Sequence, residues 1–362
     1  EDDLLKILFN ESPGIIFQIT KNGKERLVKN NIDFISLGNT IDDRKLNIHF
    51  KNKSLSLDID HFRDSWYKNS FLMDSEQTRN NKSLERFKNF KNQPLKFKFP
   101  SNYNGNLPIV NFKKEIKAAV IREKGINSER EMAYMLNLSG FRVKDVHMTD
   151  LVSGRERLED INMLVFPGGF SNSDVLGSAK GWAGAFKFNE KARKTIQDFY
   201  NKNNTLSLGV CNGCQLMMEL DILYPNKKEH HPKMEHNDSN KFECTFSSID
   251  IIKSNSIMLQ NLEGSTLGIW SAHGEGKFNF KNQNVNIAAK FHYKDYPANP
   301  NGSELSAAAI CSDDGRHLAI MPHLERSIFP WNWAHYPSGR NDKISPWILP
   351  FYNARMWLEE NA

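Results

Sequence analysis

Residues 206–218 constrain the fold of this chain more strongly than any other segment. An apolar run, residues 206–210, leads directly into Cys211, and a helical pattern begins at the next residue. Gly209 and Gly213 lie close to the cysteine, and their small size permits the sharp turn that lifts a side chain out of a sheet. The pattern is typical of a nucleophile elbow, so we expect a strand, a tight turn at Cys211 and then a helix.

The expected position of Cys211 also suits nucleophilic chemistry. Backbone N–H groups and the helix dipole at a helix N-terminus stabilise a thiolate. The N–H of Asn212 can point to the same side and receive an oxyanion. The sequence therefore predicts that Cys211 is a nucleophile.

Cys211 and Cys214 also form a C-x-x-C pair, for which other interpretations exist. A thioredoxin-like redox pair usually lies near the first strand of its domain, and half of a zinc site would need a second pair that Cys244 and Cys311 do not form. A purely structural Cys211 is the third alternative. Four cysteines spaced in this way do not resemble a disulfide framework, which favours a reducing compartment, the cytoplasm.

A thiol nucleophile needs a base, and His323 is the candidate. An apolar run, residues 318–321, leads toward His323, and Glu325 follows two residues later. If the backbone stays extended, both side chains point to the same face, so the carboxylate can hold the tautomer of the imidazole. The sequence thus predicts a Cys-His-Glu triad.

Strand-like and helix-like segments alternate through the region that precedes the cysteine. This alternation predicts an α/β fold in which a parallel sheet carries helices on both faces. Ser128 is a candidate N-cap, with Glu131 completing a capping box. Because sites in such sheets lie at the carboxyl ends of strands, the loops after residues 166 and 210 are the first candidates. The expected strands are residues 117–121, 141–148 and 161–166, and the expected helix runs from Ser128 to Gly140.

The first 112 residues have a different composition. Residues 4–60 are predicted to form short strands, most clearly 14–19 and 55–59. Residues 79–98 are basic and contain interleaved phenylalanines, so a nucleic-acid patch is one interpretation, and a solvated linker on an acidic surface is the favoured one. The net charge of +5 over 362 residues does not by itself indicate nucleic acid. No apolar run is long enough to cross a bilayer, and a start at Glu1 suggests a piece of a longer polypeptide.

Several longer motifs give a specific family resemblance. The cysteine and histidine segments resemble class I (triad) glutamine amidotransferases, and more narrowly the glutaminase domain of the large, single-chain phosphoribosylformylglycinamidine synthases. The resemblance covers residues 117–358, and residues 8–14 and 62–70 resemble the end of the second synthetase half of those enzymes. The motifs that carry it are residues 167–177, 181–183, 209–215, 237–243, 271–276, 296–302, 323–325 and 353–358.

The resemblance implies a domain division and a function. Residues 1–75 would be the remnant of the second synthetase half, 76–112 a basic linker, and 113–362 a flavodoxin-like glutaminase domain. The domain would hydrolyse glutamine and supply ammonia for the ATP-dependent conversion of formylglycinamide ribonucleotide to the amidine in purine biosynthesis. ATP and Mg²⁺ would bind in synthetase regions outside this sequence, which are its expected partners. The resemblance implies no cofactor or metal here, and neither nucleic acid nor membrane as a partner.

The resemblance also implies roles for individual residues. Backbone N–H groups of Gly168, Gly169 and Asn212 would hold the oxyanion. Glutamine would be bound by Phe170, Gln215 and His273. Two departures from the family pattern are visible: His-Leu-Glu replaces His-Pro-Glu at residues 323–325, and the arginine common before Asn237 is replaced around residues 234–236. Another cysteine hydrolase of the same fold and an inactive interaction domain remain as alternatives.

Overall fold

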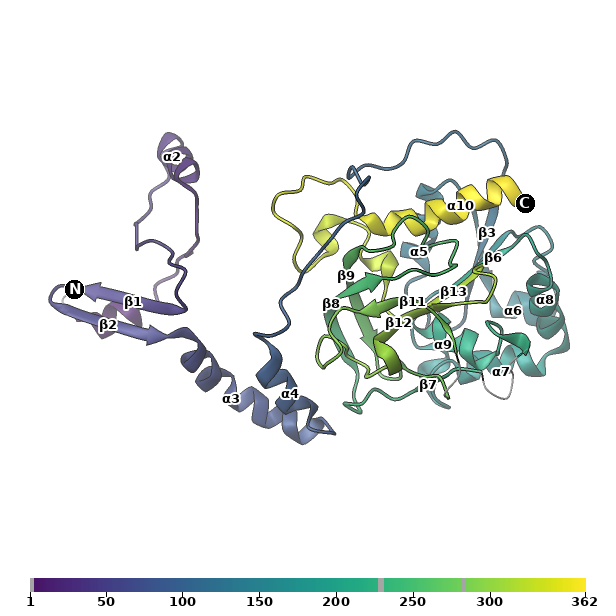
Figure 1. Cartoon of the computed structure of the whole chain (residues 1–362), viewed down its shortest axis with the longest axis horizontal. Helices are drawn as coiled ribbons and strands as arrows, with labels where there is room; N and C mark the ends of the chain where they lie inside the picture. The colour runs from purple at the N-terminus through teal and green to yellow at the C-terminus, as the bar shows by residue number, and fades with distance from the viewer. Residues whose placement is uncertain (1–2, 227–230, 282–283) are drawn as a thin grey trace. The chain divides into compact units, whose positions relative to one another are not determined.

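The computed structural model describes residues 3–226, 231–281 and 284–362. The chain divides into two compact units, one up to Met73 and one from Asp74 onwards, coloured from purple to yellow along the chain in Figure 1.

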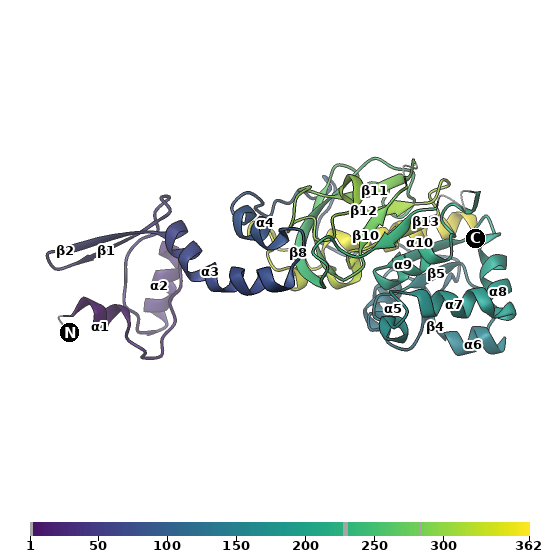
Figure 2. The same cartoon turned by 90° about the horizontal axis from the view of Figure 1, so that it is seen from below.

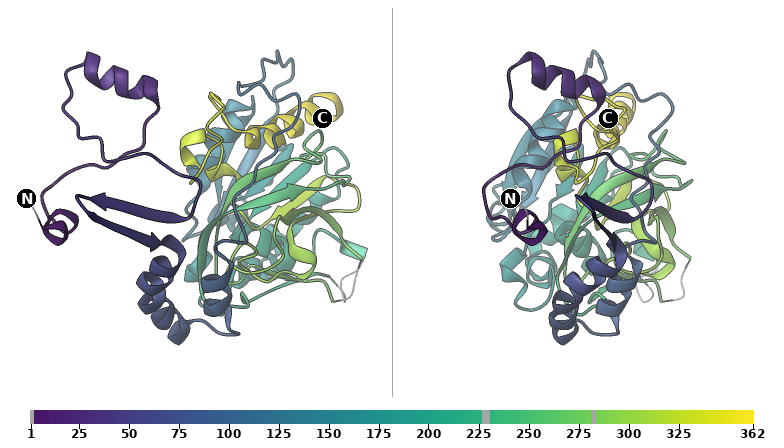
Figure 3. Two further views of the ribbon diagram at one scale, coloured as in Figure 1. Left: turned by 60° about the vertical axis from the view of Figure 1, so that its left-hand side comes forward. Right: turned by 90° about the vertical axis from the view of Figure 1, so that its left-hand side faces the viewer.

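The first unit combines a short hairpin with three helices. It contains an antiparallel hairpin of β1 (Lys45–Phe50) and β2 (Lys53–Asp58), and its elements are joined by long irregular segments (Figure 3). The strand predicted at residues 55–59 is confirmed for 55–58, which belong to β2, whereas Ile59 begins a helix. The strand predicted at 14–19 is wrong, because this segment pairs with no strand in the described part of the chain and exposes Ile15 and Ile16. The helices are α1 (Leu4–Leu8), α2 (Lys21–Lys29) and α3 (Ile59–Gln77), which continues into the second unit.

The second unit is built around a nine-stranded sheet with the order β4-β3-β5-β6-β13-β12-β11-β8-β9. The first five strands in this order are parallel to one another. Numbered by their sequence in the chain, they lie side by side in the order 2-1-3-4-5, which is that of flavodoxin-like folds. The predicted α/β class is confirmed. The parallel strands are β3 (Lys117–Arg122), β4 (Arg142–His147), β5 (Met163–Phe166), β6 (Leu206–Val210) and β13 (His317–Ile320).

The other four strands make the sheet mixed rather than wholly parallel. They are antiparallel to their neighbours and extend the sheet beyond β13. Sequence patterning missed this extension, because alternation with helices marks only the parallel strands. The strands are β8 (Glu243–Ile251), β9 (Thr266–His273), β11 (Asn286–Phe291) and β12 (Ala307–Cys311), and a separate small sheet pairs β7 (Lys233–Glu235) with β10 (Lys277–Asn279).

Helices surround the parallel half of the sheet, as Figure 2 shows for α5 to α9. Strands β5 and β6 are buried along their whole length, as expected when both faces of a parallel sheet are covered. Helix α5 buries one face, with Met132, Met135 and Leu136 in the core. The helices are α4 (Lys82–Asn89), α5 (Glu129–Leu138), α6 (Met148–Ser153), α7 (Lys180–Phe188), α8 (Glu190–Tyr200), α9 (Asn212–Glu219) and α10 (Leu349–Asn361).

Candidate active site

Cys211 occupies the turn between β6 and α9, as the sequence predicts. Its backbone has φ 51° and ψ −109°, a conformation that costs a residue with a side chain about 1–3 kcal/mol. The turn is held by hydrogen bonds from Cys211 N to Ile320 O (3.0 Å) and from Gln215 N to Cys211 O (3.0 Å). A Cβ on Gly213 would lie 1.8 Å from Phe166 O, so only glycine fits there. The nucleophile-elbow geometry is therefore confirmed.

The side chains of Cys211 and His323 meet beside Gly168. A Cβ built on Gly168 would lie 3.2 Å from Cys211 Cβ and 2.6 Å from His323 Cε1, so both groups border the same small space. Cys211 is also close enough to His323 to raise the pKa of the imidazole. The Cys211 Sγ–H donates to Ala272 O at 3.4 Å. The structure thus brings the predicted nucleophile and the predicted base together.

His323 and Glu325 form a buried pair. Nδ1 of His323 lies 2.6 Å from Oε1 of Glu325, and both side chains are almost fully enclosed. The premise of an extended backbone is wrong, because residues 324–326 form a 3-10 turn. The two side chains meet all the same, and the contact at Nδ1 leaves Nε2 as the nitrogen for proton transfer.

Electrostatics favour charge on this pair. Burial alone would lower the pKa of His323, but the charges of Glu325 and Cys211 outweigh it and raise this pKa to about 10. Burial pushes the pKa of Glu325 upward, yet the neighbouring His323 makes the net shift downward. Burial, together with the charge of Cys211, raises the pKa of Cys214 well above its ordinary value. Cys214 therefore stays a thiol, which leaves Cys211 as the candidate nucleophile at the turn.

The raised pKa of His323 predicts how the free energy of unfolding depends on pH. Because the folded state keeps a proton that the unfolded chain releases, the stabilisation is complete below pH 6.5 and is lost as the pH rises through about 10. We expect the difference in free energy of unfolding between wild type and His323→Ala to shrink across this window. Urea titrations of both proteins at several pH values would measure it, and a difference that stays constant would contradict the shift.

The predicted oxyanion donors do not behave alike. The Gly168 N–H donates to Ser128 Oγ at 2.9 Å, so it is already engaged, and this corrects the expectation that it contributes. Ser128 makes no side-chain cap on α5, so the predicted capping box is wrong: its hydroxyl serves the loop at Gly168 instead. The Gly169 N–H meets no acceptor among the residues that the structure describes. Gly169 and Asn212 therefore remain as candidate donors.

The three predicted glutamine-binding residues occupy different settings. Phe170 is half-exposed, and its ring lies 5.8 Å from that of Phe242. Gln215 is buried, and its amide donates to Glu275 O at 2.8 Å and accepts from Asn212 Nδ2 at 3.1 Å. Gln215 therefore positions its neighbours rather than presenting a free amide.

His273 is the third of these residues, and it is buried beside His323. Burial, with the positive charge of His323, lowers the pKa of His273 to about 3, so its ring is neutral. Neither ring nitrogen has a hydrogen-bond partner from another residue in the described ranges. The ring thus holds two enclosed nitrogens whose hydrogen-bonding capacity is unused.

Two acidic residues of the site were missed by sequence reasoning. Asp174 accepts from Asn212 Nδ2 at 3.2 Å, and the carboxylate of Glu275 accepts from the Ser178 N–H at 3.3 Å. Burial raises the pKa of Asp174, and the nearby Glu275 adds to the shift. Both residues lie within motifs that carry the family resemblance, so their presence in those motifs was the available signal.

Other site types receive little support. Within residues 3–226, 231–281 and 284–362, no group of three or more His, Cys, Asp or Glu side chains could hold a metal ion. All four cysteines are free thiols, and only Cys244 is exposed. Over the same ranges, every helix is too short or too polar to traverse a bilayer.

Comparison with known proteins agrees with this geometry. Residues 115–358 match the protein family described as CobB/CobQ-like glutamine amidotransferase domain. A protein from Arabidopsis thaliana named "Probable phosphoribosylformylglycinamidine synthase, chloroplastic/mitochondrial" is 39% identical over 98% of this chain and 27% of its own length. Phosphoribosylformylglycinamidine synthase from Homo sapiens is 34% identical over 99% of this chain and 30% of its own length.

A solved structure supports the fold. PurLQS from Thermotoga maritima matches with a TM-score of 0.53 and 23% identity, covering 68% of this chain and 100% of that chain. The present chain spans less than a third of the length of the curated relatives named above. The family match covers most of the second unit. It includes the turn at Cys211, the His323–Glu325 pair and the loops around them. The chain therefore belongs to the family of CobB/CobQ-like glutamine amidotransferase domains.

Proposed function

We propose that this chain hydrolyses glutamine to glutamate and ammonia. The observation that carries the proposal is the strained Cys211 at the elbow, bordering the same space as the buried His323–Glu325 pair. Strained backbone conformations that the surrounding structure enforces are concentrated at active sites, where the strain is part of the mechanism. Family membership supports glutamine as the substrate.

The residues suggest a two-stage reaction. Cys211 Sγ attacks the side-chain amide carbon of glutamine, and the N–H groups of Gly169 and Asn212 stabilise the oxyanion. His323 protonates the departing ammonia, which leaves a glutamyl thioester. His323 then activates a water molecule that releases glutamate, while Glu325 keeps the imidazole oriented.

The neutral His273 and the half-exposed Phe170 are proposed to contact the bound glutamine. Gln215 is proposed to position this part of the site through its hydrogen bonds to Asn212 and Glu275. None of these groups carries a proton in the reaction, so we expect their loss to weaken glutamine binding more than it slows the chemical step.

The ammonia is proposed to serve the ATP-dependent conversion of formylglycinamide ribonucleotide to the amidine. The relatives' names support this acceptor, and ATP and Mg²⁺ would bind in synthetase regions outside the chain. We propose that residues 1–75 end such a region, 76–112 link it and 113–362 form the glutaminase. The family match from residue 115 and the unit boundary at Asp74 support the division. The proposed compartment is the cytoplasm.

The basic segment 79–98 is proposed to be an intramolecular linker and not a nucleic-acid surface. Arg86 pairs with Asp74 and Glu243, and Lys82 pairs with Glu85. These basic side chains therefore already have acidic partners within the second unit.

A direct assay tests the proposal. We expect the purified chain to release glutamate from glutamine slowly, and to make no formylglycinamidine ribonucleotide when ATP, Mg²⁺, glutamine and the acceptor are all supplied. The slow rate is expected because the synthetase regions outside this sequence would activate hydrolysis only when the acceptor is bound. Ammonia released without an acceptor would be wasted. Asparagine is the matched control substrate and should not be hydrolysed.

Each alternative makes a different prediction in this assay. An inactive interaction domain would release no glutamate at any enzyme concentration. Another cysteine hydrolase would leave glutamine intact and cleave a different acyl substrate. A rate equal to that of the full-length enzyme would show that the domain is not gated.

A further inference from the structure

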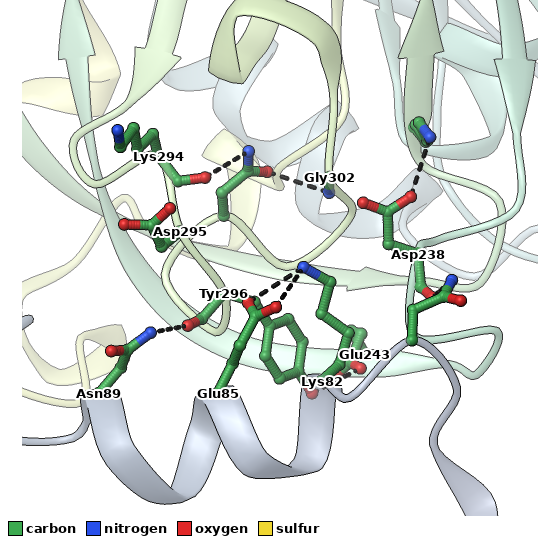
Figure 4. A network of polar contacts seen from close by, with 12 residues as sticks. Lys82, Glu85, Asn89, Asp238, Glu243, Lys294, Asp295, Tyr296 and Gly302 are labelled. Atoms are coloured by element: carbon green, nitrogen blue, oxygen red, sulfur yellow. Dashed lines mark hydrogen bonds and ion pairs between the residues drawn. The ribbon is translucent and has the colours of Figure 1, made fainter.

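The linker helix α4 is anchored to the first residue of β8, Glu243, and to the loop that carries Tyr296. Arg86 donates to Glu243 Oε2 at 2.8 Å and also bonds to the Tyr296 hydroxyl, which in turn donates to Glu243 Oε1 at 2.9 Å. Asn89 Nδ2 donates to Tyr296 O at 2.7 Å, a contact visible in Figure 4 together with Glu243. Helix α4 is therefore bound through several polar contacts and not through a single ion pair.

The residues just before α4 extend this attachment along the loop at 238–243. Arg79 N donates to Ser239 O at 3.0 Å, and Asn80 Nδ2 donates to Asp238 O at 2.8 Å. The ammonium group of Lys241 pairs with Asp74, which also accepts from Arg86. The loop thus receives bonds from the linker at both of its ends.

Asn237 adjoins this loop, and its side chain bonds to the turn at 273–276. It is 2% exposed, and every hydrogen-bonding group of its side chain is used. Nδ2 donates to His273 O at 2.7 Å and to Lys241 O at 3.0 Å, and Oδ1 accepts from Gly276 N at 3.0 Å. The backbone N–H of Asn237 adds a bond to Gly274 O at 2.9 Å. Asn237 therefore joins the loop bound by the linker to the turn at 273–276.

That turn carries groups which contact the reacting residues. The residue preceding it, Ala272, accepts from the sulfur of Cys211, and the ring of His273 lies beside His323. Glu275 O accepts from Gln215 at 2.8 Å. A shift of the turn would move all of these groups relative to Cys211, and displacements of about 1 Å can lower a rate by about 100-fold.

We infer that Asn237 is a positioning residue for glutamine hydrolysis and that Arg86 on α4 holds it in place. The inference rests on the proposed glutaminase function. The chain of contacts runs from Arg86 through Glu243 and its loop to Asn237, and from there to the turn beside Cys211. The linker thereby helps to position the residues of the proposed glutamine site.

The test compares Asn237→Asp with a matched asparagine. A carboxylate cannot donate to the carbonyls of His273 and Lys241, so we expect kcat/KM for glutamine to fall by about 10- to 100-fold. Asn353 bridges two carbonyls in the same way, Met258 O at 2.9 Å and Gln260 O at 2.7 Å, but belongs to α10. Asn353→Asp should lower stability only. Titration of the reactive Cys211 thiol measures the concentration of folded sites. The rates are divided by this concentration, so unfolding of a variant is not mistaken for a loss of activity.

Arg86 is tested in parallel. We expect Arg86→Ala to raise KM and lower kcat for each titrated site, with a combined loss of about 2- to 30-fold. Arg86→Lys keeps one positive charge near Asp74 and Glu243 and should recover part of the loss. Arg316→Ala is the control, because Arg316 pairs with Asp314 and donates to Lys202 O away from Cys211.

A second measurement keeps this test separate from that of the proposed function. The rate at which iodoacetamide alkylates Cys211 needs no glutamine, and it should change in Asn237→Asp and Arg86→Ala but not in the controls. A wild type that cannot hydrolyse glutamine would overturn the proposed function, while the alkylation rates would still decide the positioning role. If Asn237→Asp matches Asn353→Asp in KM, kcat for each site and alkylation rate, the inference is wrong.

Discussion

Replacing Cys211 with Ala is expected to lower glutamine hydrolysis by roughly 10⁴- to 10⁶-fold, the range seen when a catalytic triad member is removed. The side chain of Cys211 borders His323 and is lifted out of the sheet by a turn that Gly213 makes possible. Loss of the sulfur leaves the oxyanion donors and the base in place, but no covalent intermediate can form. Steady-state release of glutamate measures the effect.

Covalent labelling identifies the same residue independently of turnover. Diazo-oxo-norleucine, an electrophile that mimics glutamine, should modify Cys211 and spare Cys214, Cys244 and Cys311, as peptide mass spectrometry would show. Cys244 is the informative control because it is the exposed cysteine, whereas Cys214 and Cys311 are buried. Labelling that persists in Cys211→Ala would refute the assignment.

The central part of the fold could be predicted from the sequence because its signals are local. Strand β6, the turn at Cys211 and helix α9 follow one another within a single segment, and each has a short-range physical cause. The meeting of Cys211 and His323 could be predicted as well, since residues at the carboxyl ends of neighbouring parallel strands share one edge of the sheet.

The errors occur where the outcome depends on distant partners. Ser128 has the local pattern of a capping box, yet Gly168 competes for its hydroxyl from 40 residues away. That same bond removes Gly168 from the oxyanion donors. Residues 14–19 have the composition of a strand, but a strand also needs a neighbour with which to pair.

The contact between His323 and Glu325 shows a correct conclusion reached from an incorrect premise. Two residues at i and i+2 share a face in an extended strand, whereas the structure forms a 3-10 turn from Leu324 to Arg326. The oppositely charged side chains are buried together, and this pairing decides their orientation more strongly than strand geometry does. The role of Asn237 was missed because its partners at 273–276 are distant in sequence.

His323→Ala and Glu325→Ala are expected to differ in the size of their effects. In the proposed mechanism His323 exchanges protons with the sulfur, the leaving ammonia and the attacking water, so its loss should cost as much as the loss of Cys211, roughly 10⁶-fold. Glu325 acts only through His323, and removing such an orienting carboxylate costs roughly 10⁴-fold in a comparable triad. The two kcat values, each normalised to folded protein, provide the measurement.

Two further variants show whether these losses are chemical or structural. His317 is a matched histidine: it is also buried, begins strand β13, which ends shortly before His323, and lies 2.9 Å from Ser207 Oγ through Nδ1. His317→Ala should destabilise the fold but leave the rate for each folded molecule unchanged. Glu325→Gln preserves the volume of the side chain, but its amide can donate to Nδ1 and so place the proton on Nε2, which can then no longer act as a base. If Glu325→Gln were as active as wild type, the carboxylate would not be orienting His323, and equal rates for wild type and His323→Ala would exclude the triad itself.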